Sequence, residues 1–300
     1  MKQFEIKNIL IPVDFSATSM LALDHATFMA KLYKANITLL HVLETYTYKV
    51  ELYNFQPYAS DSEKFVDSLK EKLNELAEKL TSEIGSRVNV VVKNGKMASS
   101  VFEVSNEIKA DLVVLGTHGA KGIEEFFIGS NAFRVVTESL VPVISVQSHN
   151  KKLGYDKLFL PIDDSVSSRQ KINHALIIAK KYNSKIHLCG LISDDTDEGQ
   201  QKVFAVKVKQ AVDFLTKNEV AVTSEIKVSD NFAKTTLKEA KAQNADMTLI
   251  MKGSDAEDNF TSIFLDRYAQ QIVNHSKIPV MSITPTDSLE NVSDNMFNWG

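Results

Sequence analysis

The feature that most constrains the fold of this chain is a repeat that spans half of its length. An apolar run followed by Pro, an aliphatic residue and Asp ends at Asp14 and occurs again ending at Asp163, 149 positions later. Nearer the C-terminus, Val-Pro-Val at 141–143 matches Ile-Pro-Val at 278–280, at an offset of 137. Because long-period self-similarity indicates a duplicated unit, we predict two copies of one domain, the first about twelve residues longer.

The join between the copies is expected in the short stretch that follows residue 148. This stretch is polar and contains a glycine, which is typical of a connection between folded units. The sequence therefore predicts a first domain at 1–148, a linker at 149–156, a second domain at 157–286 and a C-terminal tail at 287–300.

Each copy alternates short β-rich runs with segments of helical periodicity. In the first copy, Leu69, Leu73, Leu76 and Leu80 recur at three- and four-residue spacing, which predicts an amphipathic helix. The β-rich runs are almost entirely apolar, as strands covered by helices on both faces must be. Alternating β and α segments imply parallel strands, so each copy is predicted to be a five-stranded, open, Rossmann-like α/β sheet. The predicted strands are Ile9–Val13, Ile37–Val42, Val88–Val92, Leu112–Leu115 and Val143–Val146, and then Lys157–Ile162, Lys185–Leu191, Val222–Val228, Met247–Met251 and Val280–Thr284.

Composition and charge narrow the class of protein further. The sequence contains no apolar run close to the roughly 20 residues that span a bilayer. The net charge of -4 is spread along the chain with both signs, so neither nucleic acid nor a membrane is expected as a partner. The single cysteine, Cys189, cannot form an internal disulfide, which favours a cytoplasmic location, and its place in a predicted strand indicates a buried, inert thiol.

Three glycines follow the fourth predicted strand of the first copy. Gly116 ends that strand at its carboxyl edge, where open α/β sheets bind ligands. Gly119 has no side chain, so the backbone there can approach a ligand closely. Gly129 and Ser130 precede a predicted helix over Asn131–Leu140, with Ser130 as its N-cap. Because the N-terminus of a helix presents unpaired N–H groups and a positive dipole end, this arrangement predicts a phosphate site.

The Gly-x2-Gly-x9-Gly-Ser spacing of these residues resembles the motif of the universal stress proteins, and the resemblance extends over both copies. It implies a tandem member of the nucleotide-binding subgroup that holds ATP or AMP, with or without Mg²⁺, in its first copy. It also implies that the last strands of the two copies pair as an internal pseudo-dimer, and that two chains can assemble further. The residues implied in nucleotide binding are Pro12, Val13, Asp14, Val42, Gly116, Thr117, Gly119, Gly129, Ser130 and Asn131.

The resemblance also suggests individual roles and shows one departure. Asp14 would accept a hydrogen bond from an adenine amine or a ribose hydroxyl, and Val42 would lie at the edge of the base. A second interpretation makes Asp14 a turn residue that caps the helix beginning near Ala17, and the two roles are compatible. Ala132 stands where nucleotide-binding members often carry a hydroxyl residue, so one phosphate contact is expected to be missing.

The second copy departs from the glycine motif. At the 137 offset, Gly253 matches Gly116, but Ala256, Asp266 and Arg267 match Gly119, Gly129 and Ser130. A carboxylate near the expected phosphate would repel it. We therefore predict that the second copy does not bind nucleotide in the same manner and serves as scaffold, dimer partner or regulator.

Three functions remain open on the sequence alone. The leading one is a cytoplasmic stress-response module that senses or stores adenine nucleotide. A slow ATPase or nucleotide transferase is a second possibility, although no base–nucleophile pair is evident, and neither catalytic residues nor metal ligands are predicted. A pure interaction protein that uses neither site is the third. The Tyr-rich segment at 44–60 is interpreted as a packed connection or, alternatively, as a lid or partner-binding loop.

Overall fold

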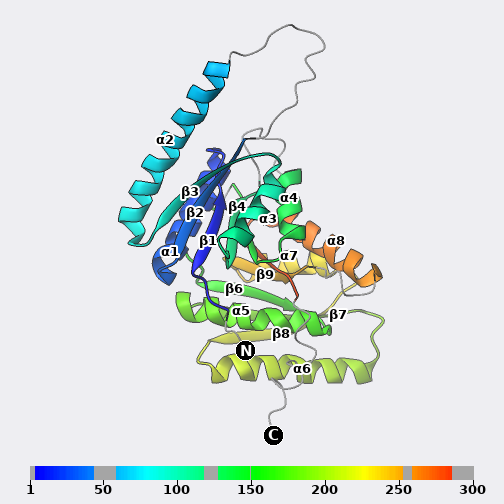
Figure 1. Ribbon diagram of the computed structural model, residues 1–300. Coiled ribbons are helices and arrows are strands. Elements are labelled where there is room, and N and C mark those ends of the chain that lie inside the picture. The colour runs from blue at the N-terminus through cyan, green and yellow to red at the C-terminus, as the bar shows by residue number, and fades with distance from the viewer. Residues whose placement is uncertain (1–3, 44–58, 118–127, 149, 253–258, 286–300) are drawn as a thin grey trace, which may run out of the picture.

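The computed structural model describes residues 4–43, 59–117, 128–148, 150–252 and 259–285, with side chains at 59–63, 65 and 259–266 left out (Figure 1). The Tyr-rich segment up to residue 58, Gly119, Gly253, Ala256 and the tail at 287–300 lie outside the described residues. The first copy consists of β1 (Asn8–Pro12), α1 (Ala17–Tyr33), β2 (Asn36–Leu43), α2 (Ala59–Ile84), β3 (Val88–Asn94), α3 (Met97–Glu107), β4 (Leu112–Gly116), α4 (Ser130–Glu138) and β5 (Val143–Val146). The second consists of β6 (Lys157–Ile162), α5 (Val166–Tyr182), β7 (Lys185–Ile192), α6 (Glu198–Lys217), β8 (Val222–Val228), α7 (Phe232–Ala242), β9 (Met247–Met251), α8 (Asn259–His275) and β10 (Val280–Ile283).

The ten strands of the described chain form one sheet in the order β3-β2-β1-β4-β5-β10-β9-β6-β7-β8. Each half is parallel, as predicted. The halves join where β5 and β10 pair antiparallel, with Val143 opposite Ser282 and Ser145 opposite Val280. The predicted pairing of the last strands is therefore confirmed. Because the junction is antiparallel, the carboxyl edges of the two halves point in opposite directions.

Helices cover both faces of the sheet, which explains the uninterrupted apolar strands. Helices α1, α2, α5 and α6 share one apolar core with the strands, whereas α3, α4, α7 and α8 pack on the opposite face. Both faces of β1 are dry: Ile9 and Leu10 belong to different cores, and each is 0% exposed. In Figure 1, α2 and α6 stand at opposite ends of the molecule beside the edge strands β3 and β8.

The strand register shows where the two copies differ in length. Leu43 at the end of β2 corresponds to Ile192 at the end of β7, still at an offset of 149. Asn94 at the end of β3 corresponds to Val228 at the end of β8, at an offset of 134. The additional residues of the first copy therefore lie between β2 and β3, in the part of the chain that holds the Tyr-rich segment.

The register also corrects one sequence match. Ile9 pairs with Leu112 as Leu158 pairs with Met247, which sets the offset at the fourth strand to 135. The counterpart of Gly116 is therefore Met251, and not Gly253 as the 137 offset predicted. The 137 offset holds from α4 onward, where Glu138 and His275 end the equivalent helices, because the second copy has two more residues between its last two strands.

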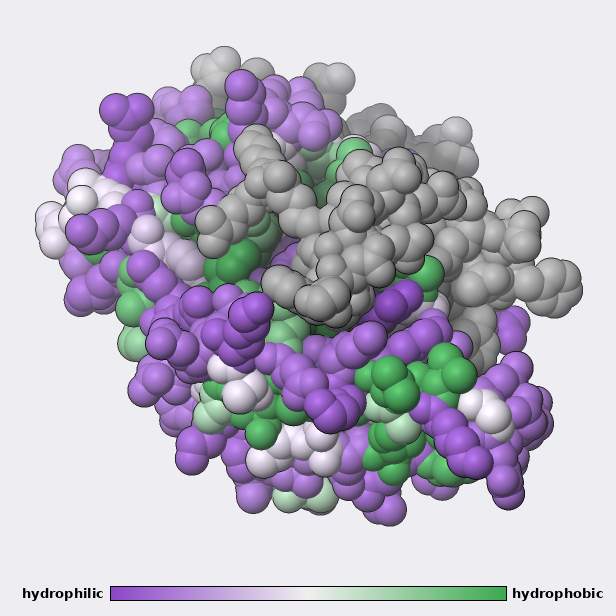
Figure 2. Space-filling view, turned by 90° about the horizontal axis from the view of Figure 1, so that it is seen from below, coloured by the Kyte–Doolittle hydropathy of each residue, from purple (hydrophilic) through white to green (hydrophobic). Residues whose placement is uncertain are grey.

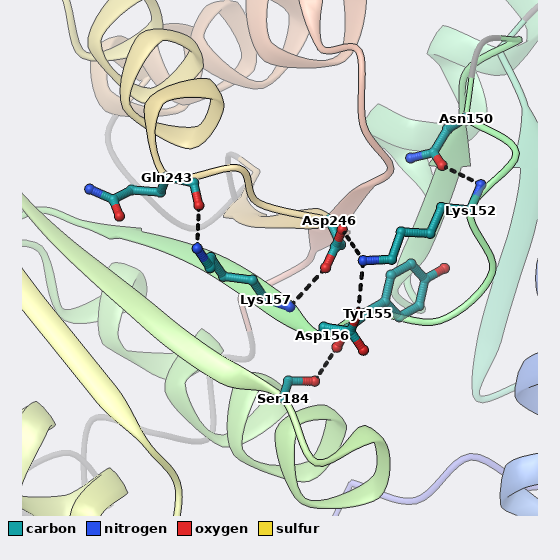
Figure 3. Close-up of polar contacts among 8 residues, drawn as sticks. All are labelled: Asn150, Lys152, Tyr155, Asp156, Lys157, Ser184, Gln243 and Asp246. Carbon is teal, nitrogen blue, oxygen red and sulfur yellow. Dashed lines mark hydrogen bonds and ion pairs between the residues drawn. The ribbon is translucent and has the colours of Figure 1, made fainter.

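The stretch between the halves is fastened to the second copy by polar contacts (Figure 3). Lys152 Nζ lies 2.8 Å from Asp246 Oδ1 and 2.9 Å from Asp156 Oδ2. The other oxygen of Asp246 accepts a hydrogen bond from the Lys157 N–H at 2.9 Å. Tyr155 is 1% exposed, and its backbone carbonyl accepts a hydrogen bond from the Ser184 hydroxyl. This stretch is therefore part of the packed interface between the halves.

His25 on α1 and His174 on α5 are 149 positions apart, and they have different surroundings. His25 is satisfied, with Nδ1 3.2 Å from the Tyr155 hydroxyl and Nε2 3.1 Å from the Asn150 carbonyl. His174, in contrast, has a buried Nδ1 without a hydrogen-bond partner among the described residues. Burial lowers the pKa of His174 to about 4. The second histidine therefore disfavours protonation in the folded state.

His174 is expected to make the protein sensitive to acid. An unfolded histidine titrates near 6.5, so the stabilising effect of neutral His174 is complete above that pH and is lost as the pH falls toward 4. Between pH 7 and pH 5 we expect the wild-type chain to lose about 2 kcal/mol more unfolding free energy than His174→Leu. Urea denaturation at both pH values measures this difference, and equal losses in the two proteins would contradict it.

Candidate functional site

The candidate site of the first copy begins in the turn between β1 and α1. Asp14 Oδ1 accepts a hydrogen bond from the Ser16 N–H at 2.9 Å, and Ser16 Oγ accepts one from the Ser19 N–H at 3.2 Å. Ser16, and not Asp14, is therefore the N-cap of α1. The second copy repeats this turn, with Asp163 accepting from the Ser165 N–H at 2.9 Å. The turn role of Asp14 is thus intrinsic to the fold, and its exposed carboxylate faces the carboxyl edge.

Two aromatic side chains beside this turn were not singled out from the sequence. His41 on β2 donates from Nδ1 to the Val13 carbonyl at 2.7 Å, because a carbonyl can only accept. Its Nε2 is then the ring acceptor when the imidazole is neutral. Phe15 has φ 61, is 40% exposed, and its ring centroid lies 6.0 Å from that of His41. A bulky residue rarely adopts a positive φ. An exposed Phe in the left-handed region therefore marks this edge as unusual.

Gly116 ends β4 beneath the first turn of α1. A Cβ built on Gly116 would lie 2.8 Å from both the carbonyl carbon and the oxygen of Thr18, closer than real side chains approach. The glycine is therefore required by the packing of α1 on β4. The next residue, Thr117, is 1% exposed and its N–H donates to the Val146 carbonyl at 3.0 Å. Gly116 and Thr117 therefore support the carboxyl edge of the sheet through contacts inside the protein.

The N-terminus of α4 is the exposed part of the site. The structure places the N-cap at Gly129, one residue earlier than predicted, and ends the helix at Glu138 rather than Leu140. Ser130 is therefore the first helical residue, and the first intrahelical hydrogen bond runs from the Phe133 N–H to the Gly129 carbonyl at 2.8 Å. Gly129, Ser130 and Asn131 are all exposed. The first-turn N–H groups and the positive dipole end therefore point toward the surface.

Gly129 differs from Gly116 because nothing in the described protein requires a glycine there. Its φ is -57, which any residue adopts. The nearest atom to a Cβ built on it is the Thr117 carbonyl oxygen at 3.5 Å, an ordinary contact. The Gly129 N–H donates to that same oxygen at 2.8 Å, which ties the helix N-terminus to the end of β4. A bare backbone at an exposed helix N-terminus suits close approach by a ligand.

The topology brings the predicted residues to one carboxyl edge. They come from the end of β1, the end of β2, the end of β4 and the N-terminus of α4, and β1 pairs with both β2 and β4. This is the switch point of the strand order, where open α/β sheets bind ligands. The residues so placed are Pro12, Val13, Asp14, Val42, Gly116, Thr117, Gly129, Ser130 and Asn131. Gly119 belongs to the connection outside the described residues.

The equivalent edge of the second copy is filled by side chains. A cavity of about 10 Å³, room for roughly one water molecule, remains there. Counterparts of the first-copy site line it: Pro161, Ile162, Asp163, Leu191, Met251 and Tyr268 correspond to Pro12, Val13, Asp14, Val42, Gly116 and Asn131. Two of these replacements, Met251 and Tyr268, are large side chains in the place of Gly116 and Asn131.

Helix α8 differs from α4 in a second way. It begins at Asn259, so Asp266, the counterpart of Gly129, lies inside the helix rather than at its start. The N–H groups that would meet a phosphate in the first copy are therefore within a continuous helix in the second. Among the described residues, the second copy therefore has no helix N-terminus at the position equivalent to Gly129.

The remaining features of the described residues are plain. They contain no group of three His, Cys, Asp or Glu side chains that could hold a metal ion, and none of their helices is long and apolar enough to cross a membrane. Cys189 is 0% exposed, and burial raises its pKa to about 12, as expected for an inert thiol. On the face seen in Figure 2, hydrophilic residues predominate and apolar residues form separate groups.

The fold defines a class: two Rossmann-like α/β units joined through the antiparallel pairing of their last strands. The model of the universal stress protein family matches residues 5–147 and again residues 154–283, so the chain belongs to that family as a tandem member.

Individual relatives agree with this assignment. A universal stress protein of Methanocaldococcus jannaschii is 31% identical over 149 residues, which cover 49% of this chain and 85% of that protein. A second one from the same organism is 28% identical over 156 residues, covering 48% and 96%. The crystal structure of a universal stress protein from Archaeoglobus fulgidus covers 95% of this chain and 98% of its own, with a TM-score of 0.74 at 19% identity, and supports the shared two-copy fold.

Proposed function

We propose that the first copy binds an adenine nucleotide, ATP or AMP, and that the protein acts as a cytoplasmic sensor or regulator in the stress response. The observation that carries this proposal is Gly129 at the exposed N-terminus of α4, a glycine that neither its backbone conformation nor packing against the described residues requires. A phosphate there would accept hydrogen bonds from the first-turn N–H groups and from the Ser130 hydroxyl.

The rest of the edge suits a nucleoside. The Asp14 carboxylate is exposed beside Val13 and can accept a hydrogen bond from a ribose hydroxyl or an adenine amine. Val42 is half-buried at the end of β2 and packs against the apolar core that lies beneath α3 and α4. Its side chain can therefore contact the edge of a base. Mg²⁺, if it accompanies the ligand, would be held mainly by phosphate oxygens, as is usual for this ion.

Occupancy would act through stability. A ligand that binds only the folded first copy stabilises it by about 2.7 kcal/mol at a concentration 100 times its dissociation constant. The regulatory signal would then be the difference between filled and empty first copies. The second copy, with its filled edge, would supply the partner strand β10 and no second nucleotide site.

The test combines two measurements on the full chain. Small molecules released from the purified, denatured protein are identified by mass spectrometry, and the melting temperature of nucleotide-free protein is measured with ATP, AMP and GTP at millimolar concentration. We expect bound adenine nucleotide or a rise of several degrees with ATP or AMP. No released nucleotide together with no shift would favour the pure interaction protein. Conversion of the added ATP would favour the enzyme.

A further inference from the structure

Helix α4, whose N-terminus forms the exposed part of the candidate site, is held at its other end by the second copy. The carbonyl of Ser139, the C-cap of α4, accepts a hydrogen bond from the Lys252 ammonium and another from Thr284 Oγ1 at 2.8 Å. Lys252 directly follows β9 and Thr284 directly follows β10. Lys252 is 0% exposed and Ser139 is 2% exposed. Because the C-terminus of a helix is the negative end of its dipole, a buried cation there stabilises α4 in this position.

A second-copy side chain also contacts the chain that enters α4. Asn274, near the C-terminal end of α8, accepts a hydrogen bond from the Ile128 N–H at 3.2 Å. The oxygen of the Asn274 amide must face this group, because a backbone N–H can only donate. Ile128 directly precedes Gly129, the N-cap of α4, and α4 packs against α8 (Figure 1). The second copy therefore contacts both ends of α4, a helix of nine residues.

The equivalent residues of the first copy do not repeat these contacts. At the offset of 137, Gln147 corresponds to Thr284, and both polar atoms of its side chain are buried without a hydrogen-bond partner among the described residues. Thr137 corresponds to Asn274, and its hydroxyl donates to a carbonyl of its own helix at 3.1 Å. In the place of the lysine the first copy has Thr117, which carries no charge. Among the described residues, the three contacts are therefore specific to the helix of the first copy.

We propose that Asn274 and Lys252 are positioning residues of the second copy, which set the affinity of the first-copy site for its ligand by fixing both ends of α4. This inference rests on the proposed function, and it makes the second copy a regulator of that site. Hydrogen bonds from the first-turn N–H groups to phosphate oxygens need distances of about 2.7–3.2 Å, so a small displacement of the helix weakens them. A helix that is fixed at both ends is already ordered when the ligand arrives, which favours binding.

The two residues control different ends of the helix. Asn274 fixes the backbone one residue before Gly129, and it therefore sets the direction in which the first-turn N–H groups point. Lys252 fixes the opposite end, and it directly follows Met251, which lines the small cavity of the second copy. Repacking of the second-copy edge would therefore displace Lys252 and, with it, the C-terminal end of α4.

The first experiment measures nucleotide affinity of the full-length chain by isothermal titration with ATP and AMP. Asn274→Leu removes the acceptor with little change in volume, and Lys252→Met removes the ammonium with little change in length. We expect about 10-fold weaker binding in each variant, the factor that corresponds to the loss of one hydrogen bond. Thr137→Val is the matched control at the position equivalent to Asn274 and should bind as the wild-type chain does, because its hydroxyl bonds within α4.

A conservative variant separates positioning from a general loss of structure. Asn274→Asp keeps an acceptor of the same shape, and in about 0.5 M salt, where its charge is screened, it should bind within about 3-fold of the wild-type chain. A loss of affinity in Asn274→Leu that Asn274→Asp does not restore would overturn the positioning role. Asn274 is only half-buried, so its variants keep the test decisive if Lys252→Met does not fold.

Amide hydrogen exchange, followed by NMR in nucleotide-free protein, gives a readout that does not depend on the ligand. The Ile128 N–H should exchange at least about 10-fold faster in Asn274→Leu than in the wild-type chain, and Asn274→Asp should restore its protection. Equal exchange in all three proteins would overturn the inference. Wild-type affinity in both Asn274→Leu and Lys252→Met would overturn it as well and leave the proposed function intact. No nucleotide binding by the wild-type chain would overturn both, so the two failures are distinguishable.

Discussion

Replacing Gly129 by Asp should abolish nucleotide binding by the first copy without unfolding it. A carboxylate at the start of α4 would stand beside the bound phosphate, where like charges about 4 Å apart repel by about 4 kcal/mol at an effective dielectric constant of 20. We therefore expect affinity for ATP or AMP to fall at least about 100-fold. The fold should tolerate the change because φ is -57 and the Cβ contact is an ordinary 3.5 Å.

The matched control for this change is Gly129→Asn. Asn and Asp have the same shape and are equally good N-cap residues, so both variants should melt within about 2 °C of the wild-type chain or above it. Only Asp carries the charge, so the difference in affinity between the two isolates the electrostatic effect. Isothermal titration with ATP and AMP measures it. Wild-type affinity in the Asp variant would show that no phosphate lies at this terminus.

Much of the fold could be predicted from the sequence because two kinds of pattern specify it: the local alternation of apolar runs with helical periodicity, and the repeat. Apolar runs bounded by helical patterns predict strands buried on both faces, and all ten predicted strands are present with ends shifted by a few residues at most. The repeat then predicts which strands meet at the middle, and β5 pairs with β10. These inferences need no knowledge of which side chains touch.

The limits of the sequence appear where a short insertion changes the alignment. Two additional residues between β9 and β10 move the match of Gly116 from Gly253 to Met251, and only the strand register reveals this. The same shift hid the filling of the second edge. Only the structure shows that Lys171, Met251 and Tyr268 line one cavity there. Spacing along the chain cannot show such a convergence from three different elements.

The sequence also could not distinguish the roles of its glycines. Gly116 and Gly129 look alike in the motif, and both were assigned to the ligand. The structure separates them, because a Cβ on Gly116 would collide with the backbone of Thr18, whereas one on Gly129 would make only an ordinary 3.5 Å contact among the described residues. The first is required by the packing of α1 on β4, and only the second is available for the proposed ligand contact.

Gly116→Ala should therefore destabilise the first copy strongly. The new Cβ would lie 2.8 Å from the carbonyl carbon and oxygen of Thr18, both of which belong to the backbone and cannot rotate away. Overpacking of this kind typically costs 1–3 kcal/mol, and rigid backbone places the expected loss at about 2–3 kcal/mol. Urea denaturation and calorimetry measure the loss, which corresponds to a melting temperature lower by roughly 5–10 °C.

Gly129→Ala is the control, since it adds the same methyl group to a glycine of the same motif. Its nearest contact is 3.5 Å, so we expect a cost below about 1 kcal/mol, mostly from the poorer N-cap. Nucleotide affinity should show the opposite order once each variant is folded, because the methyl group at Gly129 stands where the ligand approaches and the one at Gly116 lies under α1. Equal stability of the two variants would remove the evidence that α1 requires Gly116. Equal affinity would remove the evidence that Gly129 is kept bare for a ligand.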